Sequence, residues 1–172
     1  RWATIENLKR IADTSNFLTE HGIGSYEELL DRCEATTVSV ARIKANLRDA
    51  GAKIDELALK MKHVGTYRQL RPIYDRYKAS RDKEKFLRGH ESEIILFEAA
   101  ARELKRLGAV PLPTIESMKT ELANLNAEKE RLLAEYKAAR AEAQEYETVK
   151  QNVDALLTVP KEQEQQRRHE LE

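Results

Sequence analysis

A seven-residue apolar repeat between residues 25 and 80 is the feature that most constrains the fold. One line of the repeat consists of Tyr26, Cys33, Val40, Leu47, Ile54 and Met61. A second line falls between them, at Leu29 or Leu30, Thr36 or Thr37, Ile43, Leu57 and Val64. A seven-residue repeat keeps one narrow stripe of a helix facing a partner helix along its whole length. The chain must therefore supply a second long helix or pair with a second copy of itself.

Residues 114–157 predict that second long helix. Its apolar seam consists of Ile115, Met118, Leu122, Leu125, Leu132, Tyr136, Ala139, Ala143, Tyr146, Val153 and Leu157. Lys129 and Lys150 fall on the same seam. A charged residue at a seam position lowers stability but can fix the register of two helices. The alternative for both lysines is that the side chain extends along the surface into water.

Local signals predict where the helices begin and end. Residues 4–21 predict a first helix with Thr4 as N-cap and with Ile5, Leu8, Ile11 or Ala12, and Leu18 on one apolar face. Gly22 is expected to end it in the left-handed conformation, with Ile23 folding back on Leu18. Ser25 and Glu28 have the spacing of a capping box, so the long helix is expected to begin directly afterwards.

The long helix 26–78 is expected to continue through Gly51 and Gly65 because the register does not slip there. Pro72 removes a backbone donor, so a kink or break is expected near residues 69–71. A third helix, 83–107, carries apolar residues on several sides and is expected to lie between other helices. Gly89 is expected to interrupt it, with the main part beginning at His90.

Glycine and proline also predict the connection to the last helix. Gly108 is expected to end the third helix, residues 111–113 form a stiff connector, and Thr114 caps the last helix. Together these elements predict an all-α fold: an elongated, antiparallel, coiled-coil-like hairpin of residues 26–78 and 114–157. The first helix packs beside one end and the third bridges the other. We expect one domain, 1–159, and a disordered tail, 160–172, because the tail has no apolar face. Arg1 suggests an excised fragment, and Leu171 and Glu172 suggest vector-derived residues.

Composition excludes several classes of function. The 30 basic residues balance the 30 acidic residues, so any contact with nucleic acid must be local. Cys33 is the single cysteine and lies on the seam, where it is expected to be a small buried residue. No apolar run approaches the length of a membrane span. The four histidines form no ligand pair, and no catalytic motif occurs, so we expect no metal, no cofactor and no catalytic residue.

One segment departs from this balance of charge. Between residues 60 and 90, ten basic residues stand against three acidic residues, an excess of seven. The candidate DNA-binding residues are Arg68, Arg71, Arg76, Lys78, Arg81, Lys83, Lys85 and Arg88. Tyr67, Tyr74, Tyr77 and Phe86 are interleaved with them, as a surface for phosphates and unstacked bases would require. The alternative is that the tyrosines, which follow helical spacing, pack on the third helix.

Three stretches resemble the helical C-terminal region of relaxases of the mobilization nuclease family, from conjugative elements of Gram-positive bacteria. They cover residues 2–32, 67–108 and 135–157 and include the motifs NFLTEHGIGSYEEL and HESEIILFEAAARELK. The resemblance implies a protein that nicks DNA at an origin of transfer, using a tyrosine and a histidine-bound metal in an N-terminal domain. That domain and its His-x-His signature are absent from this sequence.

The resemblance therefore implies a noncatalytic, accessory domain in the bacterial cytoplasm that does not nick DNA by itself. It would hold DNA through the basic segment 60–90, or contact the relaxosome or the coupling proteins of a type IV secretion system. No membrane contact is expected. The alternative function is a structural scaffold, in which the seam drives homodimerisation or docking to another coiled coil without nucleic acid.

Overall fold

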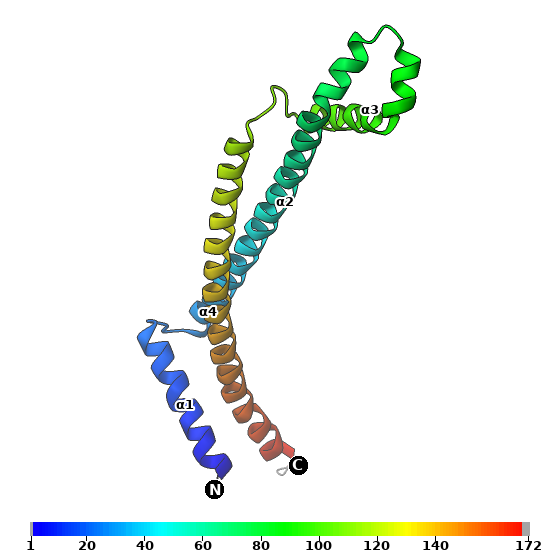
Figure 1. Ribbon diagram of the computed structural model, residues 1–172. Coiled ribbons are helices and arrows are strands. Elements are labelled where there is room, and N and C mark those ends of the chain that lie inside the picture. The colour runs from blue at the N-terminus through cyan, green and yellow to red at the C-terminus, as the bar shows by residue number, and fades with distance from the viewer. Residues whose placement is uncertain (1, 170–172) are drawn as a thin grey trace. The chain divides into compact units, whose positions relative to one another are not determined.

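The computed structural model describes the backbone of residues 2–169 and the side chains of residues 5–158. This part of the chain is all-helical and has no strand. Figure 1 shows the four helices in chain order: α1 (Trp2–Glu20), α2 (Tyr26–Ala79), α3 (Lys83–Arg106) and α4 (Ile115–His169). Their contacts form two compact units. The first contains residues 1–46 and 132–172, and the second contains residues 47–131.

In the first unit, the turn between α1 and α2 follows from its glycine and its capping residues. Gly22 has a φ of 64°, as the sequence predicts. The amide of Ile23 donates to the carbonyl of Leu18 at 2.9 Å, which is the backbone bond of a Schellman cap. The Ser25 hydroxyl accepts from the Glu28 amide at 3.1 Å. The Glu28 carboxylate accepts from the amide of Gly24, at 2.7 Å, so this capping box closes one residue earlier than the standard motif.

The core of the first unit joins three helices. Leu29 of α2 packs with Tyr146 and Val149 of α4, and all three are buried. Half-buried side chains complete this cluster: Phe17, Leu18, Ile23, Cys33 and Val153. Phe17 of α1 meets the Tyr146 ring edge to face, with 5.1 Å between the ring centres. In Figure 1, α1 lies alongside the C-terminal half of α4, and Asn152 donates to the buried Thr14 hydroxyl across this contact at 3.1 Å.

In the second unit, α3 folds back against the C-terminal part of α2 (Figure 1). Asp82 caps α3 by accepting from the Lys85 amide at 3.0 Å. His90 has non-helical backbone angles, φ −139° and ψ 25°, so the interruption lies one residue after Gly89, where the sequence predicts it. Gly108 has a φ of 66° and follows the end of α3, and the Thr114 hydroxyl caps α4 by accepting from the Ser117 amide.

The core of the second unit is formed by α2, α3, the connector and α4. Its buried residues are Leu57, Val64, Leu104, Ala109 and Met118. The buried ring of Phe97 lies between Tyr67 and Tyr74 of α2, stacked on both at centre distances of 4.6 and 4.2 Å. Pro72 therefore lies between two residues that are both held by α3. Helix α2 continues through Pro72, so the break that the sequence allowed there does not occur.

Burial follows the seven-residue repeat, but the two lines of the repeat are not equivalent. The apolar residues Leu29, Ile43, Leu57 and Val64 of one line are buried, with exposed fractions of 5 % or less. The other line, which begins at Tyr26, is only partly covered, and Tyr26 itself is 39 % exposed. On α4 the predicted seam residues Met118, Leu132 and Tyr146 are buried.

Three expectations about the helices are wrong. Helix α1 begins at Trp2, before the predicted cap at Thr4, whose side chain lies outside the described residues. Helix α4 continues to His169 instead of ending near residue 157, so 160–169 is helical where we expected disorder. Residues 170–172 of the expected tail lie outside the described residues.

The third wrong expectation concerns the surroundings of α3. Ile95 and Leu96 are 55 % and 54 % exposed, so α3 packs on one side instead of lying between other helices. The predicted apolar face of α1 is also largely exposed at its N-terminal end, where Ile5 and Leu8 are 64 % and 62 % exposed. Among the described residues, no helix is both long enough and apolar enough to cross a membrane.

Two glycines of the second unit should respond oppositely to replacement by alanine. Gly108→Ala should lower the free energy of unfolding by about 1 kcal/mol, because its φ of 66° is strained for a residue with a Cβ. Gly65→Ala should raise it by up to about 1 kcal/mol, because Gly65 lies inside α2 and nothing lies within 4 Å of the added Cβ. Urea denaturation measures both. Destabilisation by Gly65→Ala would contradict the continuous course of α2.

Candidate nucleic-acid interface

All eight predicted DNA-binding residues belong to the second unit. Arg68, Arg71, Arg76 and Lys78 lie on the last turns of α2, Arg81 lies in the turn, and Lys83, Lys85 and Arg88 lie at the start of α3. The turn is built by Asp82, which accepts from the Lys85 amide with its side chain and from the Ser80 hydroxyl with its carbonyl. The Asp82 carboxylate is thus occupied as a helix cap.

Four of the eight cations are engaged by neighbouring groups. Arg71 donates from Nε to the Asp75 carboxylate at 3.2 Å and from a terminal nitrogen to the Tyr67 hydroxyl at 2.7 Å. The hydrogen bond to Asp75 raises the pKa of Arg71. Arg88 lies 3.8 Å from the Glu84 carboxylate, and both side chains are largely exposed. Two of the three acidic residues of the segment, Asp75 and Glu84, are therefore paired. Their partners, Arg71 and Arg88, are then no longer unpaired cations.

The other two engaged cations have uncharged partners. Arg68 donates to the carbonyl of Pro113 at 3.0 Å, which ties α2 to the connector. The ammonium of Lys78 lies 5.4 Å from the centre of the Tyr74 ring, within the range of a cation–π contact. Neither contact neutralises the positive charge, so both residues still contribute to the local potential.

The remaining four cations, Arg76, Arg81, Lys83 and Lys85, are exposed. None of them forms an ion pair with any residue between 5 and 158. They lie within ten residues of one another along the chain, around the turn between α2 and α3. We call these four residues the turn cations. A cluster of exposed, unpaired cations attracts polyanions most strongly at low ionic strength.

The aromatic residues of the segment do not lie free on this surface. Tyr67 and Tyr74 stack on Phe97, as the alternative interpretation of the sequence predicted. Tyr77 and Phe86 are half-buried, with 6.3 Å between their ring centres, and Phe86 also approaches His90 at 4.7 Å. A hollow of about 330 Å³ beside Phe86 is lined by Ser80, Asp82, Lys85, Gly89 and His90. It gathers no group of catalytic carboxylates or nucleophiles.

Metal ligands do not gather in the part of the chain that the structure describes, where no group of three or more His, Cys, Asp or Glu side chains could hold an ion. The basic segment is therefore the strongest candidate site because of its charge, and not because it forms a pocket with catalytic or metal-binding groups. Comparisons with protein-family models, with curated proteins and with solved structures found no match.

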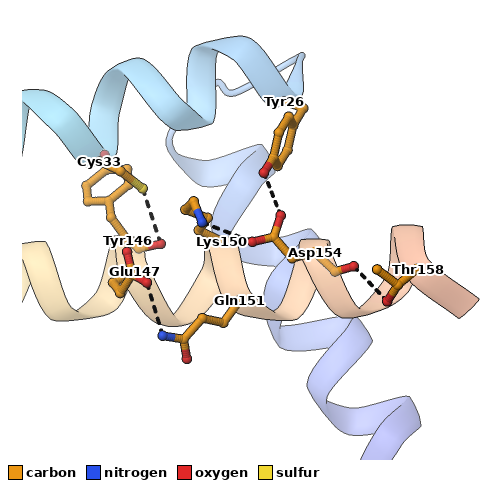
Figure 2. Close-up of polar contacts among 8 residues, drawn as sticks. All are labelled: Tyr26, Cys33, Tyr146, Glu147, Lys150, Gln151, Asp154 and Thr158. Atoms are coloured by element: carbon orange, nitrogen blue, oxygen red, sulfur yellow. Dashed lines mark hydrogen bonds and ion pairs between the residues drawn. The ribbon is translucent and has the colours of Figure 1, made fainter.

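The sequence analysis singled out Lys150 but did not predict the polar cluster of the first unit to which Lys150 belongs. Figure 2 shows the Tyr26 hydroxyl of α2 donating to the Asp154 carboxylate of α4, at 2.5 Å. Lys150 donates to the other carboxylate oxygen of Asp154 at 3.0 Å. The two hydrogen bonds, first from Tyr26 and then from Lys150, lower the pKa of Asp154. The bond to Asp154 raises the pKa of both Tyr26 and Lys150.

This cluster bears on the two lysines of the α4 seam. Lys150 is half-buried and takes part in a contact that joins α4 to α2, which supports a role in fixing register. Lys129 is exposed, as the alternative interpretation expected. Next to the cluster, the thiol of Cys33 contacts the carbonyl oxygen of Tyr146 at 3.6 Å (Figure 2). Burial raises the pKa of Cys33, so its thiol is less reactive than a free one.

The Tyr26–Asp154 contact should make stability depend on pH. Because the pKa of folded Asp154 lies below its ordinary value of 3.8, the stabilisation is complete above about pH 4 and is lost as pH falls further. Because the pKa of Tyr26 lies above 10.0, the stabilisation is also lost as pH rises beyond that value. Asp154→Asn should therefore lower the melting temperature at pH 7, and this loss should shrink as pH falls below about 4.

Thermal unfolding followed by circular dichroism measures this difference. Asp31→Asn is the matched control, because Asp31 is an exposed α2 carboxylate of the same unit whose side chain makes no hydrogen bond or ion pair within the described residues. Tyr26→Phe should cost less than Asp154→Asn, because Asp154→Asn also weakens the contact with Lys150, and the double variant should cost less than the sum of the two. Additive losses would show that the two residues do not interact.

Proposed function

We propose that this chain is a noncatalytic helical module that holds DNA through the basic segment around the α2–α3 turn. The observation that carries the proposal is the group of four turn cations, Arg76, Arg81, Lys83 and Lys85, which are exposed and form no ion pair in the described residues. Because the basic and acidic residues of the whole chain balance, this local excess of positive charge is the feature that would attract a charged partner. A polyanion with closely spaced phosphates is the partner that such a group fits best.

The acidic residues of the segment do not cancel the turn cations. Asp75 pairs with Arg71, Glu84 pairs with Arg88, and Asp82 caps α3. Asp75 and Glu84 are thus matched to arginines outside the turn cations, and Asp82 is matched to a backbone amide and not to a charged side chain. The four cations therefore stay available to release counterions from a phosphate backbone, which is the main source of affinity in nonspecific DNA binding.

The resemblance to the C-terminal region of mobilization relaxases supports DNA as the polyanion. On this proposal the chain is an accessory region of a conjugative relaxase in the bacterial cytoplasm. It keeps DNA near the nuclease domain and contacts relaxosome or secretion-coupling proteins. It does not cut DNA by itself.

We also propose that α2 and α4 pair as an elongated, antiparallel coiled-coil hairpin. Within the first unit, Tyr26 contacts Asp154 and Cys33 contacts Tyr146, so α2 and α4 run in opposite directions there. Within the second unit, Arg68 contacts Pro113. The pKa of Glu128 is lowered by Arg131 and also by the charge of Lys53. Each of these pairs fits one common antiparallel register, which supports a single hairpin.

A second candidate function is a protein-binding scaffold. The exposed side chains of Ile5 and Leu8 on α1 favour it, because a bare apolar helix face is a common docking surface. Light scattering over a concentration series separates the candidates in part. A chain that stays monomeric at high concentration would exclude the homodimer version of the scaffold.

The proposed hairpin predicts two short distances. With Cys33 replaced by Ser, spin labels at exposed positions 38 and 142, and in a second sample at 55 and 126, should each give one narrow, short distance distribution by electron–electron double resonance. Both pairs lie across the same register. A short distance for one pair and a long or broad one for the other would contradict a continuous hairpin.

The DNA-holding function predicts a loss of binding when the turn cations are removed. Arg76→Gln, Arg81→Gln, Lys83→Gln and Lys85→Gln together should weaken binding of a labelled 30-bp duplex at 50 mM salt by about tenfold or more. Fluorescence anisotropy measures this, and circular dichroism should show an unchanged helix content.

The matched control removes four exposed cations from α4 instead: Lys119, Lys129, Lys137 and Arg140, each replaced by Gln. It changes the net charge equally and should weaken binding by less than about twofold. An equal loss in both variants would mean that attraction is spread over the whole chain. That result would contradict a site at the turn.

A further inference from the structure

The aromatic side chains of the basic segment are already engaged within the protein. Phe97 stacks on Tyr67 and on Tyr74, with interplanar angles of 27° and 24°. Each of these two tyrosines also has a cation over its ring: Arg71 at 5.6 Å from the centre of Tyr67, and Lys78 at 5.4 Å from that of Tyr74. A ring with phenylalanine and a cation as neighbours has little area left for a nucleobase.

The two remaining rings are also turned toward the protein. Tyr77 approaches Tyr74 and Phe86 at centre distances of 6.0 and 6.3 Å, and all three are half-buried. Phe86 further contacts His90 at the interruption of α3. Proteins that prefer single strands combine basic grooves with exposed rings on which successive bases stack. The segment has the cations of such a surface but lacks its exposed rings.

We infer that the basic segment binds the phosphate backbone of duplex DNA and does not recognise unstacked bases. This inference rests on the proposed DNA-holding function and specifies its substrate. Without stacking, affinity follows the density of phosphate charge, which is higher along a duplex than along a flexible single strand. Contacts to phosphates also carry no direct information about sequence. The segment therefore holds duplex DNA without a sequence preference of its own.

The salt dependence of binding should reflect the number of turn cations. Four phosphate contacts predict a slope of about −3.6 for the logarithm of the duplex binding constant against the logarithm of salt concentration. Raising the salt from 50 to 200 mM should then weaken duplex binding about 150-fold. Replacing the four turn cations by Gln should remove most of this slope.

The test compares a labelled 30-bp duplex with a mixed-sequence 30-nucleotide single strand, using the full 172-residue chain and fluorescence anisotropy. The duplex should bind at least as tightly as the single strand, and a second duplex sequence should bind equally well. Tyr77→Leu keeps an apolar side chain at the α2–α3 contact and should change single-strand affinity by less than about twofold. A base stacked on this ring would make the loss roughly tenfold.

Each other outcome overturns a distinct statement. Tighter binding of the single strand that falls roughly tenfold in Tyr77→Leu would overturn the duplex inference and leave DNA holding in place. Absence of binding to either oligonucleotide at 50 mM salt would overturn both the inference and the proposed function. Tighter binding to phosphatidylserine vesicles than to the duplex would overturn both in favour of an anionic membrane surface.

Discussion

Burial of one heptad line of α2 is the interaction on which the rest of the structure depends. Leu29 and Ile43 supply it in the first unit, and Leu57 and Val64 supply it in the second. Each fully buried aliphatic side chain contributes about 1.5–3 kcal/mol, whereas isolated helices gain little from propensity alone. Because a single stripe of α2 provides this burial, most of the helix surface remains wet and can carry charge. A chain with 35 % charged residues can fold in this way without burying unpaired ions.

The same packing decides what the basic segment can do. Phe97 is 5 % exposed and holds Tyr67 and Tyr74 against α3, so the rings that the sequence offers for base stacking are used for stability. Their cationic neighbours cannot be buried at comparable cost and stay at the surface. Folding therefore separates the two halves of a pattern that looks in sequence like one nucleic-acid surface. The charged half faces solvent, and the aromatic half is half-buried in contacts within the protein.

Local features of the fold could be predicted from the sequence. The left-handed Gly22, the end of α3 before Gly108, the cap at Thr114 and an interruption of α3 within one residue of Gly89 each depend on a few neighbouring residues, and the structure has them. Features that depend on distant residues were missed. Periodicity could not rank the two heptad lines, nor show that Ile95 and Leu96 lack a covering helix. Nor could it show that Phe97, from another helix, packs on Tyr67 and Tyr74 on either side of Pro72.

The candidate site shows the same division between local and tertiary information. Arg71 and Asp75, Glu84 and Arg88, and Tyr74 and Lys78 are all four residues apart on a helix, so sequence spacing could have identified these cations as engaged. The contact from Arg68 to the carbonyl of Pro113 joins residues far apart in the chain, and no spacing rule finds it. The polar cluster of the first unit is a second example. Lys150 and Asp154 are four residues apart, whereas the Tyr26 hydroxyl that also contacts Asp154 is distant in the chain. Tertiary contacts thus determine which charges of a helical surface remain available to a partner.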